Sequence, residues 1–383
     1  MKHKVKPVGK KQEKVVAEKV DLALEEASRL TLNQIEKVKP TPFKWRLGYT
    51  IGIVTLVLIS LTFIWFNWFA RSFAKTATVP LRPIIDAVNA GIKINPFEKK
   101  EIFNLLILGL DQVMNQRESS NLTDTMMMVS INKNGRVTLI SLPRDLWIDA
   151  LKTKINSLYY YGEESEATTG MELVATMMEE ITGVKVDGTI ILRLGTVQKV
   201  IDVLGGVMVD VPKGFTDTEF PRDNVDITQS DPEILYETVT FNPGLQSMDG
   251  ATALKYIRSR HSTDIAEGND VSRVKRQQQV VLAITNNLKK PTTWFNPNRL
   301  GALYLIYQNE VKTNLQLEDF VGLTWAIKQT PLTFITTQIP IETEETMGII
   351  RHPAIEKYKL WVYEPVDPTW QELRQWVKEQ MEQ

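Results

Sequence analysis

One uncharged stretch constrains the fold of this chain more than any other feature. Residues 47–70 contain 24 residues in succession without a charge. As an α-helix, this stretch would be about 36 Å long, which is enough to cross the hydrocarbon core of a bilayer. A buried helix of a soluble domain is the alternative, but such helices seldom run this far without a polar face. A cleaved signal peptide is disfavoured because the preceding basic segment is long and the apolar stretch exceeds the usual signal length. We therefore predict a transmembrane helix over residues 47–70.

The charges on the two sides of this stretch predict its orientation. The whole chain has a net charge of −1, yet residues 1–46 carry 12 Lys and Arg against 6 Asp and Glu. A positive excess before a span places that end in the cytoplasm. A basic leader is also typical of nucleic-acid-binding arms, but the span that follows argues against nucleic acid as a partner.

These patterns predict a single-pass protein of the cell membrane with a cytoplasmic N-terminus. We expect a basic cytoplasmic segment (1–46), the transmembrane helix (47–70), a juxtamembrane connector (71–100) and an extracytoplasmic catalytic domain (101–383).

Composition excludes several kinds of chemistry. The 383 residues include no Cys, which rules out disulfide bonds, Cys-ligated zinc and thiolate catalysis. His3, His261 and His352 are the only His residues, so a Ser-His-Asp triad or a multi-His metal site lacks its parts. The common glycine-rich phosphate motifs and the G-x-S-x-G motif are missing as well. Any reaction must use carboxylates, arginines, lysines, hydroxyls or a bound metal.

Strand patterns alternate with helix patterns after the span. Residues 102–110 form a continuous apolar run that is typical of a strand buried on both faces. Residues 126–132 and 136–142 flank the turn Lys133-Asn134-Gly135, which indicates a hairpin. We expect further strands and helices at 84–90, 171–182, 196–204, 207–212, 248–258, 270–289, 332–340 and 368–381. The alternation predicts an α/β domain with a mixed central sheet flanked by helices.

Charged residues stand where the predicted strands begin or end. Asp111 follows the buried strand, Asp124 precedes the Met-rich strand, and Arg144 follows the second hairpin strand. Ligand-binding groups collect at strand ends in α/β sheets, and two carboxylates beside phosphate oxygens suit Mg²⁺. A turn residue, a strand cap and a surface salt bridge would explain the same three positions without any function.

A denser group of candidate residues lies further along the chain. If residues 258–260 are extended, Arg258 and Arg260 share one face. On the helix predicted to begin at Asp270, Arg273 and Gln277 share a face by their spacing of four. Guanidinium groups gathered in one cleft repel one another unless an anion binds, and arginine makes paired hydrogen bonds to phosphate oxygens. The pattern favours a polyanionic substrate, and a solvated basic helix face is the alternative.

Taken together, these segments resemble the LytR-CpsA-Psr family of membrane-anchored glycopolymer phosphotransferases. The resemblance covers about residues 101–290 and rests on seven blocks in the family's order and spacing: NLLILGLD, LTDTMMMVSIN, LISLPRDLWI, KINSLYYYG, VIDVLGGVMVDVP, FNPGLQSMDGATALKYIRSR and NDVSRVKRQQQVVLAI. It implies transfer of a glycan phosphate from a polyprenyl-pyrophosphate carrier to a hydroxyl of peptidoglycan or another cell-envelope acceptor, with Mg²⁺.

The resemblance also implies roles for individual residues. Asp111 and Asp124 match the metal ligands, and Asp270 matches the acidic residue beside the site and is one candidate for the general base, Asp124 being another. The pyrophosphate contacts match Arg144, Arg258, Arg260, Arg273 and Gln277. The chain departs from the family at Leu122, where an Arg usually stands, and Arg117 is the candidate that could replace that charge.

Two other functions remain open from the sequence. A polyprenyl-pyrophosphate hydrolase would use water in place of the glycan hydroxyl. A non-catalytic membrane-tethered binding or regulatory protein would use the arginines only to bind an anion. The lipid tail of the carrier needs an apolar slot, which the apolar faces of helices 171–182 and 196–204 could form. Ordinary core packing explains those faces equally well.

Overall fold

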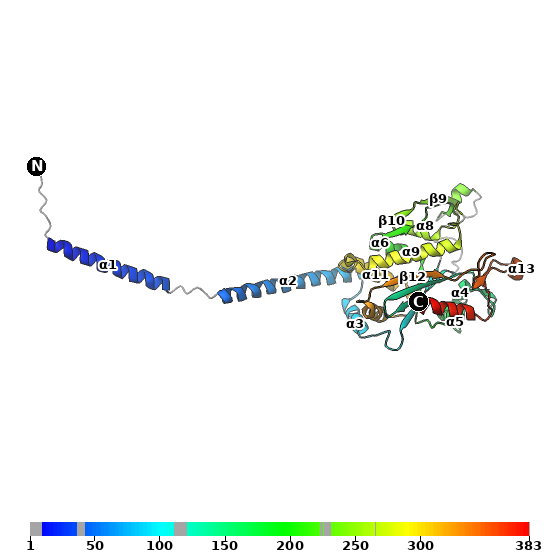
Figure 1. Ribbon diagram of the computed structural model, residues 1–383, viewed down its shortest axis with the longest axis horizontal. Helices are drawn as coiled ribbons and strands as arrows, with labels where there is room; N and C mark the ends of the chain where they lie inside the picture. Colours follow the sequence, from blue (N-terminus) through cyan, green and yellow to red (C-terminus); the bar gives the residue numbers. More distant parts are fainter. Residues whose placement is uncertain are drawn as a thin grey trace. The chain divides into compact units, whose positions relative to one another are not determined.

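The structure is a computed structural model that describes residues 10–36, 43–110, 121–222, 225, 231–264 and 266–382 (Figure 1). The chain divides into two compact units, Met1–Trp68 and Phe69–Gln383. The first contains α1 (Lys10–Glu36) and most of α2 (Phe43–Ala77). Residues Leu47–Ala77 of α2 are long and apolar enough to cross a membrane. This candidate span includes the predicted residues 47–70 and continues to Ala77, and its last residues, from Phe69, belong to the second unit.

The second unit begins with the end of α2. Phe73 and Ala77 are buried there, and the Phe73 ring lies 6.1 Å from that of Tyr304 on α11 (Pro297–Glu310). A side chain at Gly301 of α11 would clash with Thr76 and the Phe73 carbonyl, so the two helices touch through a glycine. α2 ends at Ala77, before Thr78 with its φ of 55°, and Pro80 is the N-cap of α3 (Leu81–Gly91), which contacts α12 (Leu317–Ile327).

A mixed six-stranded sheet is the centre of the second unit, as predicted. Its strand order is β11-β6-β1-β2-β3-β12. β1 pairs antiparallel with β2 and parallel with β6, and β2 and β3 form the predicted hairpin. Gly135 adopts a φ of 91° in its turn, a conformation that glycine tolerates best. The strands are β1 (Ile102–Leu110), β2 (Thr123–Asn132), β3 (Arg136–Leu142), β6 (Gly188–Arg193), β11 (Lys312–Thr313) and β12 (Thr333–Gln338).

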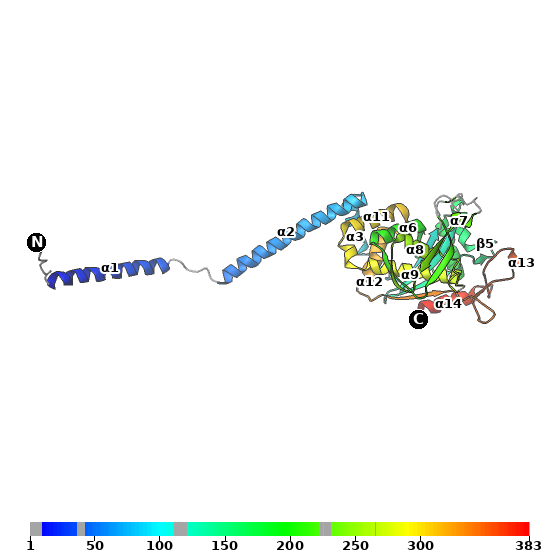
Figure 2. The same ribbon diagram turned by 90° about the horizontal axis from the view of Figure 1, so that it is seen from above.

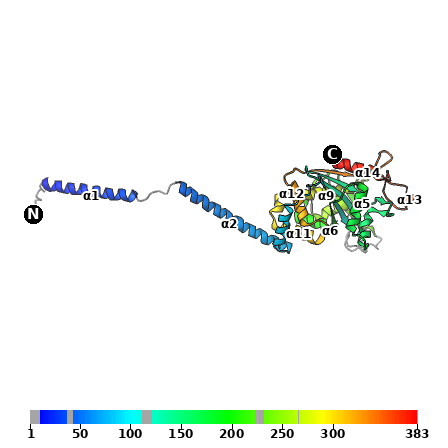
Figure 3. The same cartoon turned by 90° about the horizontal axis from the view of Figure 1, so that it is seen from below.

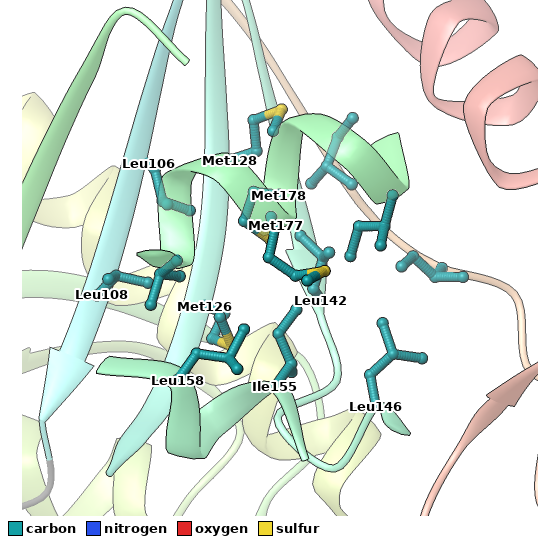
Figure 4. Packing of buried hydrophobic residues seen from close by; sticks show 14 of the residues in the cluster. Leu106, Leu108, Met126, Met128, Leu142, Leu146, Ile155, Leu158, Met177 and Met178 are labelled. Atoms are coloured by element: carbon teal, nitrogen blue, oxygen red, sulfur yellow. The ribbon is translucent and has the colours of Figure 1, made fainter. Parts of the chain in front are cut away.

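The two faces of the sheet are covered by different helices. On β1, Leu106 and Leu108 face the core formed with α4 (Leu158–Glu163), α5 (Gly170–Thr182) and α14 (Gln371–Glu382), as Figure 4 shows for the α5 contacts. Phe103 and Leu105 face the opposite core, formed with α12 and with Val281 of α9 (Asp270–Leu288). This alternation follows from the two-residue period of a strand. Burial on both faces explains why residues 102–110 form an unbroken apolar run.

A third core lies on the other side of α9. It joins α6 (Leu194–Leu204), α8 (Gly250–Arg258) and a group of strands to Val280 and Ala283 of α9. Those strands are β7 (Val207–Val211), β8 (Phe215–Pro221), β9 (Tyr236–Phe241) and β10 (Gly244–Met248), with α7 (Pro232–Leu235) between β8 and β9. Because α5 and α6 bury their apolar faces in different cores, core packing accounts for both faces, and the two helices do not form one lipid slot.

Short elements complete the unit. They are β4 (Trp147–Ile148), β5 (Thr153–Lys154), the 3₁₀ turn Ile155–Ser157, α10 (Pro291–Trp294), β13 (Ile350–Arg351), α13 (Ile355–Tyr358) and β14 (Glu364–Pro365). Helix α14 begins at Gln371, later than predicted, because the Asp367 carboxylate accepts hydrogen bonds from the backbone of Gln371 and Glu372. Figures 1, 2 and 3 agree that α11 lies at one end of this unit and α13 at the opposite end.

Candidate functional site

A pocket lies where β2 begins, β3 and β12 end and α9 begins. One part of its lining is charged or polar: Asp124, Arg144, Asp145, Asp270, Arg273, Gln277 and Tyr363. Another part is apolar: Met126, Leu142, Val271, Val274, Ile339 and Ile341. Segments more than two hundred residues apart in the sequence therefore form one cavity that combines charge with an apolar wall.

The hairpin brings Arg144 to Asp124. Because Met126 pairs with Leu142 across the β2–β3 ladder, the residues just beyond that pair lie at the same edge of the sheet. Arg144 Nη1 donates to Asp124 Oδ1 at 2.6 Å, and Arg144 Nε lies 3.5 Å from Asp145 Oδ2. Burial lowers the pKa of Arg144, but the attraction of Asp124 and its hydrogen bond outweigh this, so the pKa is raised. Arg144 therefore stays charged.

A lysine that the sequence analysis did not single out completes this network. Lys154 Nζ on β5 donates to Asp145 Oδ1 at 2.6 Å, and Asp145 is 8% exposed. A buried carboxylate needs such a partner. Lys154 thus neutralises Asp145 and leaves Arg144 oriented between two carboxylates.

The first turn of α9 carries Arg273, a buried arginine whose charge is poorly compensated. The Asn269 side chain accepts from Ser272 N and caps the helix, which places Arg273 in its first turn. The Arg273 side chain is 4% exposed, and its Nη2 lies 3.3 Å from Asp270 Oδ1. Its Nε is buried and makes no hydrogen bond within the described residues. Burial lowers the pKa of Arg273 to about 10, and repulsion from Arg260 and Arg144 adds to this effect.

Arg258 and Arg260 point to different neighbours. The condition under which Arg258 and Arg260 would share one face, an extended segment 258–260, is not met at Arg258, because α8 continues through that residue and the chain turns at Ser259 (φ −56°, ψ 132°). The Arg258 guanidinium lies over the Phe220 ring, 5.4 Å from its centroid. Arg260 Nη2 instead lies 3.8 Å from Asp124 Oδ2. The structure therefore brings Arg260 next to Asp124, which lines the pocket, and places Arg258 against β8.

Two buried residues fix the segment that carries Arg260. The fully buried Asp217 accepts hydrogen bonds from the backbone N–H groups of Arg260 and His261 at 3.0 and 3.2 Å. Arg276 on α9, 2% exposed, donates to the carbonyl oxygens of Tyr256 and Ser259 at 3.0 and 2.6 Å. Arg276 thus supports the site without lining the pocket. Sequence spacing could not separate it from Arg273, because both belong to the same run of basic residues on α9.

Other predicted site residues have separate outcomes. Gln277 lines the pocket with Arg273, as their spacing of four predicts, and Asp270 lies beside them. Asp111 and Arg117 lie outside the described residues. Leu122 is half-buried directly before β2. No sequence pattern indicated Tyr363 as a pocket residue, since it comes from a distant segment. Burial raises the pKa of Tyr363, and so do the charges of Asp270 and Asp145.

Carboxylates do not gather into a metal cage in the described part of the chain. No group of three or more His, Cys, Asp or Glu residues there is placed to hold a metal ion. Asp124 offers two oxygen atoms, and both face arginines. A cation at Asp124 would need further oxygen ligands from Asp111 or from a bound substrate.

The matched region of the chain includes every residue that lines the pocket except Tyr363. The family model for the LytR_cpsA_psr family matches residues 70–360. The chain belongs to the LytR-CpsA-Psr family. Among its relatives is the polyisoprenyl-teichoic acid–peptidoglycan teichoic acid transferase TagU of Bacillus subtilis (strain 168), which is 25% identical over 278 residues, 70% of this chain and 79% of TagU.

Two further proteins show how far the likeness extends. The probable cell wall biosynthesis protein LcpB of Corynebacterium glutamicum is 31% identical over 180 residues, 46% of this chain and 37% of LcpB. The crystal structure of B. subtilis TagV superimposes with a TM-score of 0.52 and 20% identity, covering 74% of this chain and 98% of TagV. This last comparison shows that the fold is that of LytR-CpsA-Psr proteins, as the sequence blocks predicted.

Proposed function

We propose that the protein is a membrane-anchored phosphotransferase that moves a glycan phosphate from a polyprenyl-pyrophosphate carrier to a hydroxyl of peptidoglycan or another cell-envelope acceptor. The name of TagU, a teichoic acid transferase that uses a polyisoprenyl-linked donor and peptidoglycan, supports this proposal. The observation that carries it is the convergence of Arg144, Arg260 and Arg273 beside an apolar wall.

The charges of the pocket suit a pyrophosphate. Arg273 is buried, repelled by two other arginines, and has an Nε without a hydrogen bond in the described structure. A bound phosphate oxygen would supply the missing acceptor and offset the repulsion. The apolar residues Met126, Leu142 and Ile339 line the same pocket and suit the first isoprene units of the carrier.

The reaction follows from these contacts. The acceptor hydroxyl oxygen attacks the sugar-side phosphorus, the bond from that phosphorus to the bridging oxygen breaks, and polyprenyl phosphate leaves. The arginines neutralise the negative charge that grows on the leaving phosphate. The hydroxyl proton passes to a carboxylate. Asp270 is the better base, because its side chain is 41% exposed whereas both oxygens of Asp124 face arginines.

Mg²⁺ dependence is a second part of the proposal. Asp124 would hold the ion together with Asp111 and substrate oxygens, which are hard ligands of the kind Mg²⁺ prefers. When bound, the ion would add positive charge beside the pyrophosphate. Calorimetric titration of Mn²⁺ or Mg²⁺ into the protein with inorganic pyrophosphate tests this without turnover. Asp124→Asn should weaken metal binding, and unchanged binding in that variant would contradict the assignment.

The proposed orientation puts the N-terminal segment in the cytoplasm and the second unit outside. Because the chain has no Cys, single cysteines can be introduced for labelling. A membrane-impermeant maleimide should label Thr346→Cys in intact cells and should not label Ser28→Cys until the cells are opened. The reverse pattern would overturn the orientation.

One experiment separates the three candidate functions. Purified protein is incubated with a carrier that is radiolabelled at the sugar-side phosphate and with peptidoglycan. A transferase leaves the label on the acceptor, a hydrolase releases free sugar phosphate, and a binding protein leaves the carrier intact. Arg260→Gln should lower transfer at least a hundredfold and keep the thermal unfolding curve of the parent protein.

A further inference from the structure

Three aromatic residues from the C-terminal part of the chain form a rim beside the pocket. It consists of Trp361, His352 and Tyr363. Trp361 and Tyr363 share one face of an extended segment, while the alternating residues Val362 and Glu364 are buried. Tyr363 lines the pocket, and Trp361 is 56% exposed. The rim therefore runs from the cavity to the surface.

Backbone hydrogen bonds hold this rim against the arginine site. Tyr363 N donates to the Asp145 carbonyl at 3.0 Å, and Trp147 N donates to the Tyr363 carbonyl at 2.7 Å. The buried Glu364 accepts from Arg351, Lys357 and Tyr358, which fixes the base of the same segment. The rim and Arg144 thus occupy set positions relative to each other.

The imidazole ring of His352 in this rim lacks hydrogen-bond partners in the described structure. The ring packs edge-on against Trp361, and its centroid lies 6.0 Å from that of the Tyr363 ring. Both ring nitrogens are buried without a hydrogen-bond partner in the described structure. Such unpaired groups are rare and call for an explanation. A hydroxyl-rich ligand that packed on the indole and reached the imidazole would supply the partners that the imidazole lacks.

We propose that Trp361, His352 and Tyr363 form a binding subsite for pyranose rings of the acceptor glycan. This inference rests on the proposed function and names where the acceptor lies. Aromatic faces pack against the apolar faces of sugar rings, and the nearby hydroxyls make hydrogen bonds. A glycan held at Trp361 would run along Tyr363 into the pocket, which would place one of its hydroxyls beside the arginines.

The position of the rim favours the acceptor over the lipid carrier. α13, which precedes Trp361 in the chain, lies at the end of the second unit opposite α11, against which the last turns of α2 pack (Figures 1 and 2). The carrier approaches from the membrane side, so the opposite end suits a wall polymer. We therefore assign the rim to binding of the acceptor.

Steady-state transfer kinetics with a soluble peptidoglycan oligosaccharide test this subsite. Trp361→Ala should raise the KM for the acceptor about five- to tenfold and leave kcat and the donor KM within twofold of the parent protein. Trp361→Phe should recover most of the loss. The matched control is Trp325→Ala, which removes a tryptophan that is 45% exposed on α12 and should change none of these constants.

Two results would overturn the subsite. One is an unchanged KM for the acceptor in Trp361→Ala. The other is a rise in the KM for the donor alone, which would show that the rim binds the glycan of the donor. If the parent protein transfers nothing to any acceptor, the proposed function fails. Calorimetric titration with the oligosaccharide then still tests whether the rim binds glycan. Binding should weaken at least fivefold in Trp361→Ala, and equal binding by both proteins would reject it.

Discussion

Replacing Arg273 with Met should stabilise the ligand-free protein while abolishing its response to pyrophosphate. The Arg273 side chain is 4% exposed, and Asp270, its ion-pair partner 3.3 Å away, is 41% exposed. The charge is therefore buried with a partner that remains partly in water. Methionine keeps much of the apolar stem and removes the charge. Replacement of a poorly compensated buried ion by an apolar residue of similar shape is often stabilising.

The size of the effect follows from the lowered pKa. A change from 12.5 to about 10 corresponds to roughly 3 kcal/mol of unfavourable interaction with the charged form, an upper bound for the gain. At pH 7 the arginine is charged in both the folded and the unfolded chain, so the whole penalty is present. Between the two pKa values the unfolded chain binds more protons, so the stability of the parent protein rises with pH in that window. We expect the melting temperature of Arg273→Met to rise by about 2–6 °C at pH 7.

Thermal unfolding with and without inorganic pyrophosphate measures both parts of this prediction. Pyrophosphate at a hundred times its Kd should stabilise the parent protein by about 2.7 kcal/mol and should leave Arg273→Met unchanged. Arg276→Met is the control, because that residue satisfies the Tyr256 and Ser259 carbonyls and its loss should cost about 3 kcal/mol. A less stable Arg273→Met variant that still responds to pyrophosphate would show that the Arg273 charge is neither destabilising nor needed for pyrophosphate binding.

Two other substitutions test the base and the support of the rim. Asp270→Asn should keep the donor KM within about threefold and lower kcat roughly a hundredfold or more in the transfer assay, and an unchanged kcat would exclude Asp270 as the base. Burial raises the pKa of Glu364, but hydrogen bonds from Lys357, Arg351 and Tyr358 outweigh it and hold the pKa below its usual value. The carboxylate therefore stabilises the fold above the unfolded pKa and loses this effect as the pH falls through the folded value. Glu364→Gln should lower the unfolding free energy at pH 7 and flatten its decline in acid, whereas parallel pH profiles of unfolding would contradict this account.

Local patterns in the sequence were enough to predict four strands of the central sheet, β1, β2, β3 and β12, whereas β6 and β11 were missed. The unbroken apolar run of β1 indicated a strand covered on both sides, and the structure places Leu106 and Leu105 in opposite cores. The Asn-Gly turn predicted the β2–β3 hairpin, which in turn sets Arg144 beside Asp124. These features depend on neighbours within a few residues or on one ladder, so periodicity and turn chemistry contain the information.

Contacts between distant segments could not be predicted in the same way. Alternation suggested that Arg258 and Arg260 share a face, but α8 extends through Arg258 and the buried Asp217 captures the backbone just after it. Lys154 and Tyr363 join the site through tertiary packing, for which a single sequence holds no signal. The separate roles of Arg273 and Arg276 likewise depend on which side of α9 meets which core.

The central claim is that Arg144, Arg260 and Arg273 converge on a lipid pyrophosphate. A crystal structure with a short-chain polyprenyl pyrophosphate tests it most directly. Phosphate oxygens should lie within hydrogen-bond distance of all three guanidinium groups, and isoprene carbons should pack against Met126 and Ile339. A ligand bound elsewhere on the protein, with the three arginines still facing Asp124 and Asp270 alone, would contradict it.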